Sequence, residues 1–319
     1  MTLTELRYIV ALARERHFGR AAEKCFVSQP TLSVAVKKLE DELGVALFER
    51  RANDVTVTPV GGRIVEQAQR VLEEASAIKN LATQGKDELA APLRFGAIYT
   101  IGPYLMPQLI PLLNRRAPRM PLMIQENYTA RLSELLKTGE LDLVVLSLPF
   151  AEPGIVTQAV YDEPFRVLVP VTHPWSRRTR IAANDLCREN LLLLSSGNCF
   201  RDQVLESCAG VERAQAEGMQ QSLEGSSLET IRHMVASGAG ITVLPAAAAE
   251  SRAAENKLTA VRPFAPPVPS RRVVLAWRRS FPRPRAVEAV RQAILACKLP
   301  GVTMLPNAAP SPSAMSREA

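Results

Sequence analysis

Hydrophobic positions in the first ninety residues recur with the spacing of helices. Leu6, Val10 and Ala13 fall at i, i+4 and i+7, so they share one face of a helix. A second short helix is expected over residues 18–25 and a third over residues 29–43. Ser28 is a favourable N-cap for the third helix, and Gly44 is a favourable C-terminal stop.

The third helix has a clear division between an apolar and a polar face. Its apolar face is expected to be buried and consists of Leu32, Val36, Leu39 and Leu43. The other face carries Gln29, Thr31, Ser33, Lys37 and Lys38, and Pro30 suits the first turn. Short polar groups near the start and cations further along are typical of a helix that reads base edges and touches phosphates.

Two short strands are expected after this helix, at residues 47–51 and 55–58. With the three helices they predict a winged helix-turn-helix whose wing carries Arg50 and Arg51. A generic small helical domain with solvated Lys and Arg explains the same spacing, and the pattern alone leaves both interpretations open.

A long helix is expected after Thr58 and Pro59. Its small and apolar residues step by 4, 3, 4, 3 and 4: Ile64, Ala68, Val71, Ala75, Ile78 and Ala82. This heptad seam predicts a coiled-coil dimer that reads two half-sites of DNA. The alternative is that the seam packs on the downstream part of its own chain.

From residue 93 onward, expected strands alternate with expected helices. The strands are placed at 93–97, 122–126, 141–146, 165–171, 191–194, 240–245 and 273–277, and the helices at 103–115, 131–136, 227–235 and 284–297. Strand–helix alternation with continuous apolar strands predicts a parallel α/β sheet covered on both faces. Residues 161–167 are a candidate crossover to a second lobe, and the strand at 273–277 returns to the first. Residues 300–319, rich in Pro, Ser and Ala, are expected to be disordered.

Composition refines this picture without deciding function. The 319 residues are 47% hydrophobic and 22% charged, which suits two or three soluble domains. There is no long apolar run and no secretory pattern at the N-terminus, so a cytoplasmic protein is expected, with no membrane partner. The net charge is +7, but residues 1–90 carry thirteen basic and thirteen acidic residues, while residues 271–291 carry seven Arg and one Glu. The argument for DNA binding therefore rests on pattern rather than on total charge.

Two of the five cysteines lie close together, Cys199 and Cys208. Asn198 or Ser196 can cap a helix that begins near Cys199, and the positive end of a helix dipole favours a thiolate, with Arg201 as a further source of positive charge. A thiolate attacks peroxide to give a sulfenic acid, which a second thiol resolves to a disulfide. If the segment from 199 to 208 is helical, the two Cα atoms are nine helical steps apart, about 13 Å. A disulfide needs roughly 4.4–6.8 Å, so oxidation would require refolding.

The alternative interpretation is structural: free cysteines are often small, buried hydrophobic residues. Cys25, Cys187 and Cys297 are expected to be of that kind. A zinc site built from Cys199, Cys208 and His173 or His233 is not expected, because the sequence has no close Cys/His pair. No other metal or cofactor is indicated.

The N-terminal segments match a known family in order. Residues 18–25 (FGRAAEKC), 27–33 (VSQPTLS), 38–44 (KLEDELG), 47–50 (LFER) and 58–61 (TPVG) together resemble the LysR-type transcriptional regulators. The resemblance implies that residues 28–38 enter the major groove. Bases would then be contacted by Gln29, Pro30 and Ser33, with Ser28 and Thr31 beside them, and phosphates by Lys37, Arg50 and Arg51.

The resemblance also implies an organisation for the whole chain. A winged helix-turn-helix would occupy residues 1–58 and a dimerisation helix residues 59–90. A two-lobed regulatory domain like a periplasmic binding protein would occupy residues 91–299, with lobe I at about 91–161 and 268–299 and lobe II at about 162–267. Residues 300–319 would form the tail.

Further motifs resemble the peroxide-sensing members of that family: residues 198–203 (NCFRDQ) with Cys208, 227–230 (SLET), 238–242 (GAGIT), 99–104 (YTIGPY) and 173–175 (HPW). This resemblance implies that Cys199 is the peroxidatic thiol and Cys208 the resolving thiol. It places the hydroxyls of Thr100 and Thr129 near the peroxide. The stretch 209–224 departs from the family pattern in length and sequence.

The expected function is therefore a peroxide-activated transcription factor, not an enzyme. The resemblance implies promoter DNA, hydrogen peroxide and RNA polymerase as partners, a homodimer within a homotetramer, and glutaredoxin or thioredoxin as reductant. One alternative is a LysR-type regulator that binds a small metabolite between its lobes and has inert cysteines. Another is a thiol peroxidase, ranked last because the DNA-binding module has no role in it.

Overall fold

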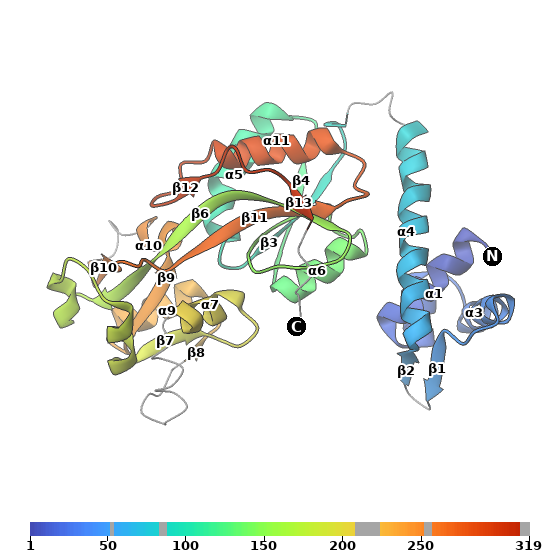
Figure 1. The fold of residues 1–319 in the computed structure, drawn as a ribbon, viewed down its shortest axis with the longest axis horizontal. Coiled ribbons are helices and arrows are strands. Elements are labelled where there is room, and N and C mark those ends of the chain that lie inside the picture. The colour runs from blue at the N-terminus through green and yellow to red at the C-terminus, as the bar shows by residue number, and fades with distance from the viewer. Residues whose placement is uncertain (52–53, 83–87, 208–223, 252–256, 313–319) are drawn as a thin grey trace. The chain divides into compact units, whose positions relative to one another are not determined.

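The computed structural model describes residues 1–319 with the exception of 52–53, 83–87, 208–223, 252–256 and 313–319 (Figure 1). The chain divides into two compact units, Met1–Lys86 and Asp87–Ala319. The first unit contains one hydrophobic core, and the second unit contains two.

The first unit begins with three helices, α1 (Leu3–Glu15), α2 (Phe18–Lys24) and α3 (Gln29–Leu43). Thr2 and Glu5 form a capping box at the start of α1, and Ser28 and Gly44 cap α3 as predicted. The core between these helices contains Ile9, Leu12, Leu32, Val36 and Leu39. The prediction that Leu43 is buried is wrong: at the last position of α3 its side chain is 37% exposed.

The wing is a two-stranded antiparallel sheet of β1 (Phe48–Arg51) and β2 (Asp54–Val57). Its presence beside α3 confirms the winged helix-turn-helix over the generic helical domain. Arg50 and Arg51 lie in β1, paired with Val55 and Asp54. Their side chains lie outside what the structure describes.

The long helix α4 runs from Pro59 to Ala82. Thr58 accepts a 2.8 Å hydrogen bond from the Gly61 amide and starts the helix. A Cβ at Gly61 would lie 2.2 Å from the Leu47 carbonyl oxygen, so only glycine fits there. The heptad seam is partly wrong as a dimer interface, because Ile64 and Ala68 pack into the core of their own unit.

The rest of the seam on α4 differs from its first turns. Val71 is 37% and Ile78 is 67% exposed, so apolar surface is available toward the end of the helix. The packing of the first turns follows from α1, which lies alongside α4 and needs an apolar partner.

The second unit is built on one curled sheet with strand order β4-β3-β5-β11-β6-β9-β7-β8. In chain order these strands are β3 (Leu93–Ile98), β4 (Leu122–Asn127), β5 (Leu143–Ser147), β6 (Ile155–Pro170), β7 (Leu191–Leu194), β8 (Glu224–Gly225), β9 (Ile241–Pro245) and β11 (Ser270–Arg278). The helices are α5 (Gly102–Arg116), α6 (Thr129–Lys137), α7 (Cys199–Ser207), α9 (Leu228–Ala236), α10 (Ala246–Glu250) and α11 (Pro284–Leu295). The short elements are η1 (Pro174–Arg177), η2 (Ala183–Arg188), β10 (Thr259–Pro263), β12 (Thr303–Met304) and β13 (Ser311–Pro312).

The prediction of a parallel sheet holds only within each half. β3 pairs in parallel with β4 and β5, and β7 with β8 and β9. The two long strands β6 and β11 instead pair antiparallel with each other and with their neighbours. The predicted crossover at 161–167 lies inside β6, which continues without a break from one half into the other (Figure 1).

Two hydrophobic cores define the halves of this unit. One contains residues from the 93–161 and 273–299 segments together with Ala247, and the other contains residues from 165–264. This two-lobed α/β arrangement with an attached winged helix-turn-helix is the predicted fold class. The numerical lobe limits given above stay a prediction.

The interpretation of residues 300–319 as a disordered tail is wrong for its first part. β12 and β13 pair antiparallel with β6, and Gln158 donates a 2.7 Å hydrogen bond to the Ala308 carbonyl. The reason is the edge of β6 opposite β11, whose backbone groups need partners. Residues 313–319 lie outside the described part of the chain.

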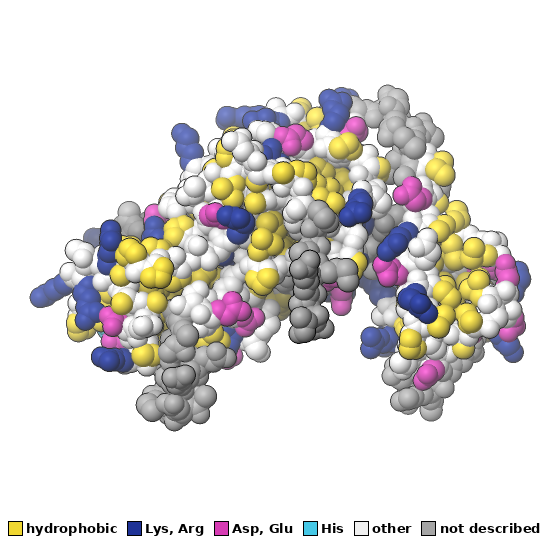
Figure 2. All heavy atoms as spheres, viewed as in Figure 1, with side chains coloured by type: hydrophobic (Ala, Val, Ile, Leu, Met, Phe, Trp, Pro, Cys, Tyr) yellow, Lys and Arg dark blue, Asp and Glu magenta, His cyan; other side chains and the backbone are white. Residues whose placement is uncertain are grey.

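The arginine-rich segment 271–291 is not a basic stripe. Arg271, Arg278 and Arg291 are at most 8% exposed. In Figure 2, Lys and Arg side chains are spread over the visible face with Asp and Glu between them. In the described part of the chain, no helix is both long and apolar enough to cross a membrane.

Candidate functional site

A small pocket lies where strands β3, β4 and β7 end. It is lined by Ile98, Tyr99, Thr100, Asn127, Tyr128, Thr129, Gly197, Asn198 and Cys199. β3 pairs in parallel with β4, and the chain after β7 brings Cys199 to the same place. Sites at the carboxyl ends of parallel strands are typical of α/β folds, because loops of different strands converge there.

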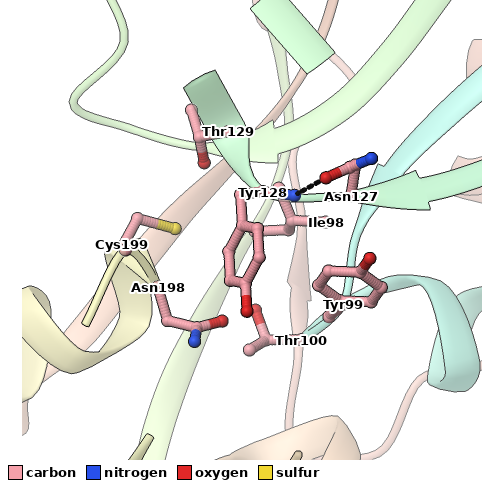
Figure 3. Close-up of a pocket in the computed structure, with 9 residues that line it drawn as sticks. Ile98, Tyr99, Thr100, Asn127, Tyr128, Thr129, Asn198 and Cys199 are labelled. Carbon is pink, nitrogen blue, oxygen red and sulfur yellow. Dashed lines mark hydrogen bonds between the residues drawn. The ribbon is translucent and has the colours of Figure 1, made fainter. Parts of the chain in front are cut away.

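Cys199 is the first residue of α7 and is half-buried. Figure 3 shows its sulfur pointing toward Thr129 and the Tyr128 ring rather than into the body of α7. The position confirms that the helix begins near Cys199, at the end of the dipole that favours an anion. The thiol is therefore both reachable and open to the pocket.

A buried arginine forms hydrogen bonds with Thr100. Arg271 donates a 2.8 Å hydrogen bond to Thr100 Oγ1 and a 3.0 Å bond to the Thr100 carbonyl oxygen. Arginine has no acceptor, so the threonine hydroxyl must accept from it. The hydroxyl proton of Thr100 is then left to donate elsewhere, and the pocket is the space beside it.

Thr129 presents a second hydroxyl. Its Oγ1 is buried and has no hydrogen-bond partner. An unsatisfied buried hydroxyl costs about 1–3 kcal/mol. In Figure 3 this hydroxyl and the Cys199 sulfur point into the same space. The arrangement is suited to a small guest with oxygen atoms.

The size of the pocket restricts the guest. Its interior volume is about 10 Å³. That is room for about one water-sized molecule. A sugar or a dicarboxylate is too large for this space.

α7 is fixed to its surroundings by two side chains. Gln203 donates hydrogen bonds of 2.8 Å to Ser147 Oγ and 2.7 Å to the Leu148 carbonyl oxygen. Arg201 donates to the Leu194 carbonyl at 2.9 Å and pairs with Glu224 at 2.5 Å. Arg201 does not line the pocket, so the structure gives no support to the expectation that it adds to the field at Cys199.

The length of α7 separates the two thiols. Cys208 follows Ser207 directly but lies outside the described residues. Cys199 and Ser207 are eight helical steps apart, about 12 Å along the axis. Consecutive Cα atoms are about 3.8 Å apart, so covalent geometry alone keeps the Cα atoms of Cys199 and Cys208 at least about 8 Å apart while α7 is intact. A disulfide between them requires α7 to unwind.

The other described cysteines differ from Cys199. Burial raises the pKa of Cys297 to about 11, and its thiol donates to the Ala293 carbonyl. Burial also raises the pKa of Cys25. Cys187 is half-buried, with its thiol donating to the Asn184 carbonyl at 2.9 Å. Among described residues, no three His, Cys, Asp or Glu side chains are placed to hold a metal ion.

The predicted DNA-reading residues lie together at the start of α3. Ser28, Gln29, Pro30, Thr31 and Lys37 are exposed, and Ser33 is half-buried. Ser28 and Thr31 are engaged with each other, with their hydroxyl oxygens 2.8 Å apart. This pairing leaves Gln29 as the longest polar side chain at the tip.

Sequence reasoning missed two apolar residues on this surface. Val34 is 69% and Phe26 is 96% exposed. Val34 follows Pro30 by one helical turn, which places it on the exposed face of α3. The available signal was an apolar residue on the polar face of the helical pattern. Such a residue can contact a thymine methyl group.

Sequence reasoning also missed Arg271 and the carboxylate with which it forms a buried 2.7 Å ion pair, Glu163. In the sequence Arg271 is only one member of a basic segment, although its side chain is 1% exposed and is hydrogen-bonded to the pocket residue Thr100. The available signal was its place at the start of an otherwise apolar strand. Asn198 was considered only as a helix cap, and it lines the pocket beside Cys199.

Comparison with known proteins shows which family the chain resembles. Residues 3–62 match the bacterial regulatory helix-turn-helix protein of the lysR family, and residues 86–297 match the LysR substrate binding domain. A hydrogen peroxide-inducible genes activator of Pectobacterium carotovorum is 41% identical over 88% of this chain and 92% of its own. The chain belongs to the LysR family.

Solved OxyR structures resemble the fold as well. Full-length OxyR C199D from Pseudomonas aeruginosa is 55% identical with a TM-score of 0.77, covering 96% of this chain and 98% of that one. A hydrogen-peroxide-bound OxyR mutant of Corynebacterium glutamicum is 32% identical with a TM-score of 0.61, covering 92% and 91%. The predicted membership of the LysR family, and its peroxide-sensing branch, is thereby confirmed.

Proposed function

We propose that this LysR-family protein is a transcription activator switched on by hydrogen peroxide through Cys199 and Cys208. The observation that carries the proposal is the pocket itself. A reachable thiol at a helix N-terminus shares a space of about 10 Å³ with the unpartnered hydroxyl of Thr129. A metabolite-responsive regulator would need a larger cavity.

The chemistry follows from the groups present. The Cys199 thiolate attacks one oxygen of peroxide, an S–O bond forms, and the O–O bond breaks. The departing hydroxide accepts hydrogen bonds from the Thr100 and Thr129 hydroxyls and, with one proton, leaves as water. Cys208 thiolate then attacks the sulfenic sulfur, and a second hydroxide leaves as water. The balance is two thiols and one peroxide to one disulfide and two waters.

The structural consequence is the loss of α7. Because the helix spans Cys199 to Ser207, the disulfide unwinds it and releases Gln203 from Ser147 and Leu148. These contacts join α7 to the end of β5, so oxidation changes the surface where the two lobes meet. We propose that this change re-spaces the dimers of a homotetramer.

The switch would act on promoter DNA through the N-terminal unit. The exposed start of α3 would enter the major groove, with Gln29 and Pro30 at base edges and Lys37 at a phosphate. Val71 and Ile78 would join two α4 helices and so pair two half-sites. RNA polymerase would be the partner at the promoter in the bacterial cytoplasm, and glutaredoxin or thioredoxin would return the disulfide to thiols.

The protein acts once per oxidation event instead of turning over peroxide. The test is a DNA footprint and an in vitro transcription assay on the full chain, with and without peroxide. Wild type is expected to change its footprint and raise transcription, and Cys199→Ser is expected to do neither. A Cys199→Ser protein that still responds, or a wild type that only consumes peroxide with a dithiol, contradicts the proposal.

A further inference from the structure

Arg271 and Glu163 form a buried ion pair behind the pocket residue Thr100. Arg271 Nε and Arg271 Nη2 both donate to Glu163 Oε2, at 2.9 and 2.7 Å. Both side chains are 1% exposed. Ions this deeply buried need partners for every oxygen and proton, so their mutual orientation is tightly defined.

The other oxygen of Glu163 is also occupied. Its Oε1 accepts a 2.8 Å hydrogen bond from the Ala247 amide, at the start of α10. Glu163 lies on β6, Arg271 on β11 and Ala247 on α10, so three elements fix the carboxylate. The carboxylate in turn fixes the two guanidinium nitrogens that face it.

The remaining guanidinium nitrogen is then directed to Thr100. With Nε and Nη2 on the carboxylate, Arg271 Nη1 donates to Thr100 Oγ1 at 2.8 Å. The Arg271 guanidinium also lies 5.4 Å from the Phe200 ring centroid, beside Cys199 in sequence. A charged donor polarises the hydroxyl that accepts from it and makes that hydroxyl a better donor.

We infer that Glu163 is a positioning residue of the peroxide site. It holds Arg271 so that the Thr100 hydroxyl accepts on one side and donates into the pocket on the other. Glu163 touches neither the thiol nor the pocket, and acts through Arg271 and Thr100. The inference rests on the proposed peroxide reaction and adds to it the group that keeps one donor aligned.

The experiment compares Glu163→Gln with Glu250→Gln in the full-length protein. Glu250 is a matched control, because it pairs with Arg166 of the same strand β6 at 2.8 Å and does not line the pocket. Two rates are measured for each variant at one pH: oxidation of Cys199 by peroxide and alkylation of Cys199 by iodoacetamide. Alkylation reports the thiolate and its exposure, and it needs no donor to a departing hydroxide.

Glu163→Gln is expected to slow peroxide oxidation about tenfold and to change alkylation by less than about twofold. In a Thr100→Val background the same substitution is expected to change peroxide oxidation by less than about twofold, because both act through one hydroxyl. Glu250→Gln is expected to leave both rates unchanged. Equal loss of both reactions, an effect that persists fully without the Thr100 hydroxyl, or an unchanged peroxide rate would overturn the inference.

Two further variants keep the test decisive if Glu163→Gln folds poorly. Glu163→Asp retains the charge and is expected to give an intermediate peroxide rate with normal alkylation. Glu163→Gln combined with Arg271→Met removes both charges and is expected to fold, yet to oxidise as slowly as Thr100→Val. A peroxide rate near wild type in either variant counts against the inference. If wild-type Cys199 itself fails to react with peroxide, the proposed function fails instead.

Discussion

Gln203, in the middle of α7, donates a 2.8 Å hydrogen bond to Ser147 Oγ at the end of β5. Its second bond goes to the Leu148 carbonyl, while its own Oε1 is buried without a partner. This side chain therefore joins the helix that must unwind to the strand that stays, at the cost of one unsatisfied oxygen.

Replacing Gln203 is expected to favour the disulfide. Gln203→Leu removes two hydrogen bonds that exist only while α7 is intact, worth about 1 kcal/mol net after the unsatisfied oxygen is also removed. Because the reduced form alone is destabilised, the midpoint potential should become more negative by about 20 mV. Titration in dithiol redox buffers measures it, with Glu206→Gln on the same helix as a control. An unchanged or less negative potential would contradict the role of this contact.

Thr129→Val is expected to separate stability from reactivity. Valine has nearly the same shape and removes the unsatisfied hydroxyl, so the reduced protein should gain up to about 1 kcal/mol of unfolding free energy. The peroxide rate should fall about 100-fold with the loss of one donor. Thermal unfolding and stopped-flow oxidation check the two effects. A destabilised variant that keeps its rate would show that Thr129 serves packing alone.

The described cysteines are expected to differ in reactivity with pH. The raised pKa of Cys297, about 11, leaves only about one thiolate per thousand molecules at pH 8. Its alkylation should increase tenfold per pH unit up to about pH 11, provided that the fold persists. Pulse alkylation followed by peptide mass spectrometry measures this. Rapid alkylation of Cys297 at pH 7 would contradict the burial of its thiol.

Lys37 and Lys38 are expected to differ on DNA. Lys37 is exposed on the polar face of α3, whereas Lys38 forms an ion pair with Glu5 at 3.4 Å. Lys37→Ala should weaken binding to all sequences and reduce the slope of log K against log salt by about 0.9 per lost phosphate contact. Lys38→Ala should have a smaller effect. Fluorescence anisotropy over a salt series measures the slope for each variant. Equal slopes in both variants would argue against Lys37 as a phosphate contact.

Local sequence patterns predicted the N-terminal unit well, because its helices and caps depend on residues that are close together in sequence. The caps Ser28 and Gly44 and the buried Leu32 and Leu39 follow from helical spacing alone. Leu43 was misassigned because the last turn of a helix extends beyond the core it covers. The seam on α4 was misread since sequence spacing does not say which helix covers an apolar face.

In the regulatory unit, the misses depend on contacts between distant residues. Arg271 looks like one of seven surface arginines until β6 places Glu163 beside it. The first part of the tail looks disordered until the edge of β6 offers it a partner. Cys199 was found because its evidence is local: a cap, a helix start and a second cysteine nearby. Its partners Thr100 and Thr129 came from resemblance, because no spacing in the sequence connects residues that follow different strands, here β3 and β4.

One equivalent of peroxide is expected to join Cys199 to Cys208. The most direct measurement is peptide mass spectrometry of the purified protein after that treatment, with free thiols alkylated first. A Cys199–Cys208 disulfide is expected, absent in Cys199→Ser, with Cys25, Cys187 and Cys297 still free. Five free thiols, or a disulfide that uses another cysteine, would contradict it.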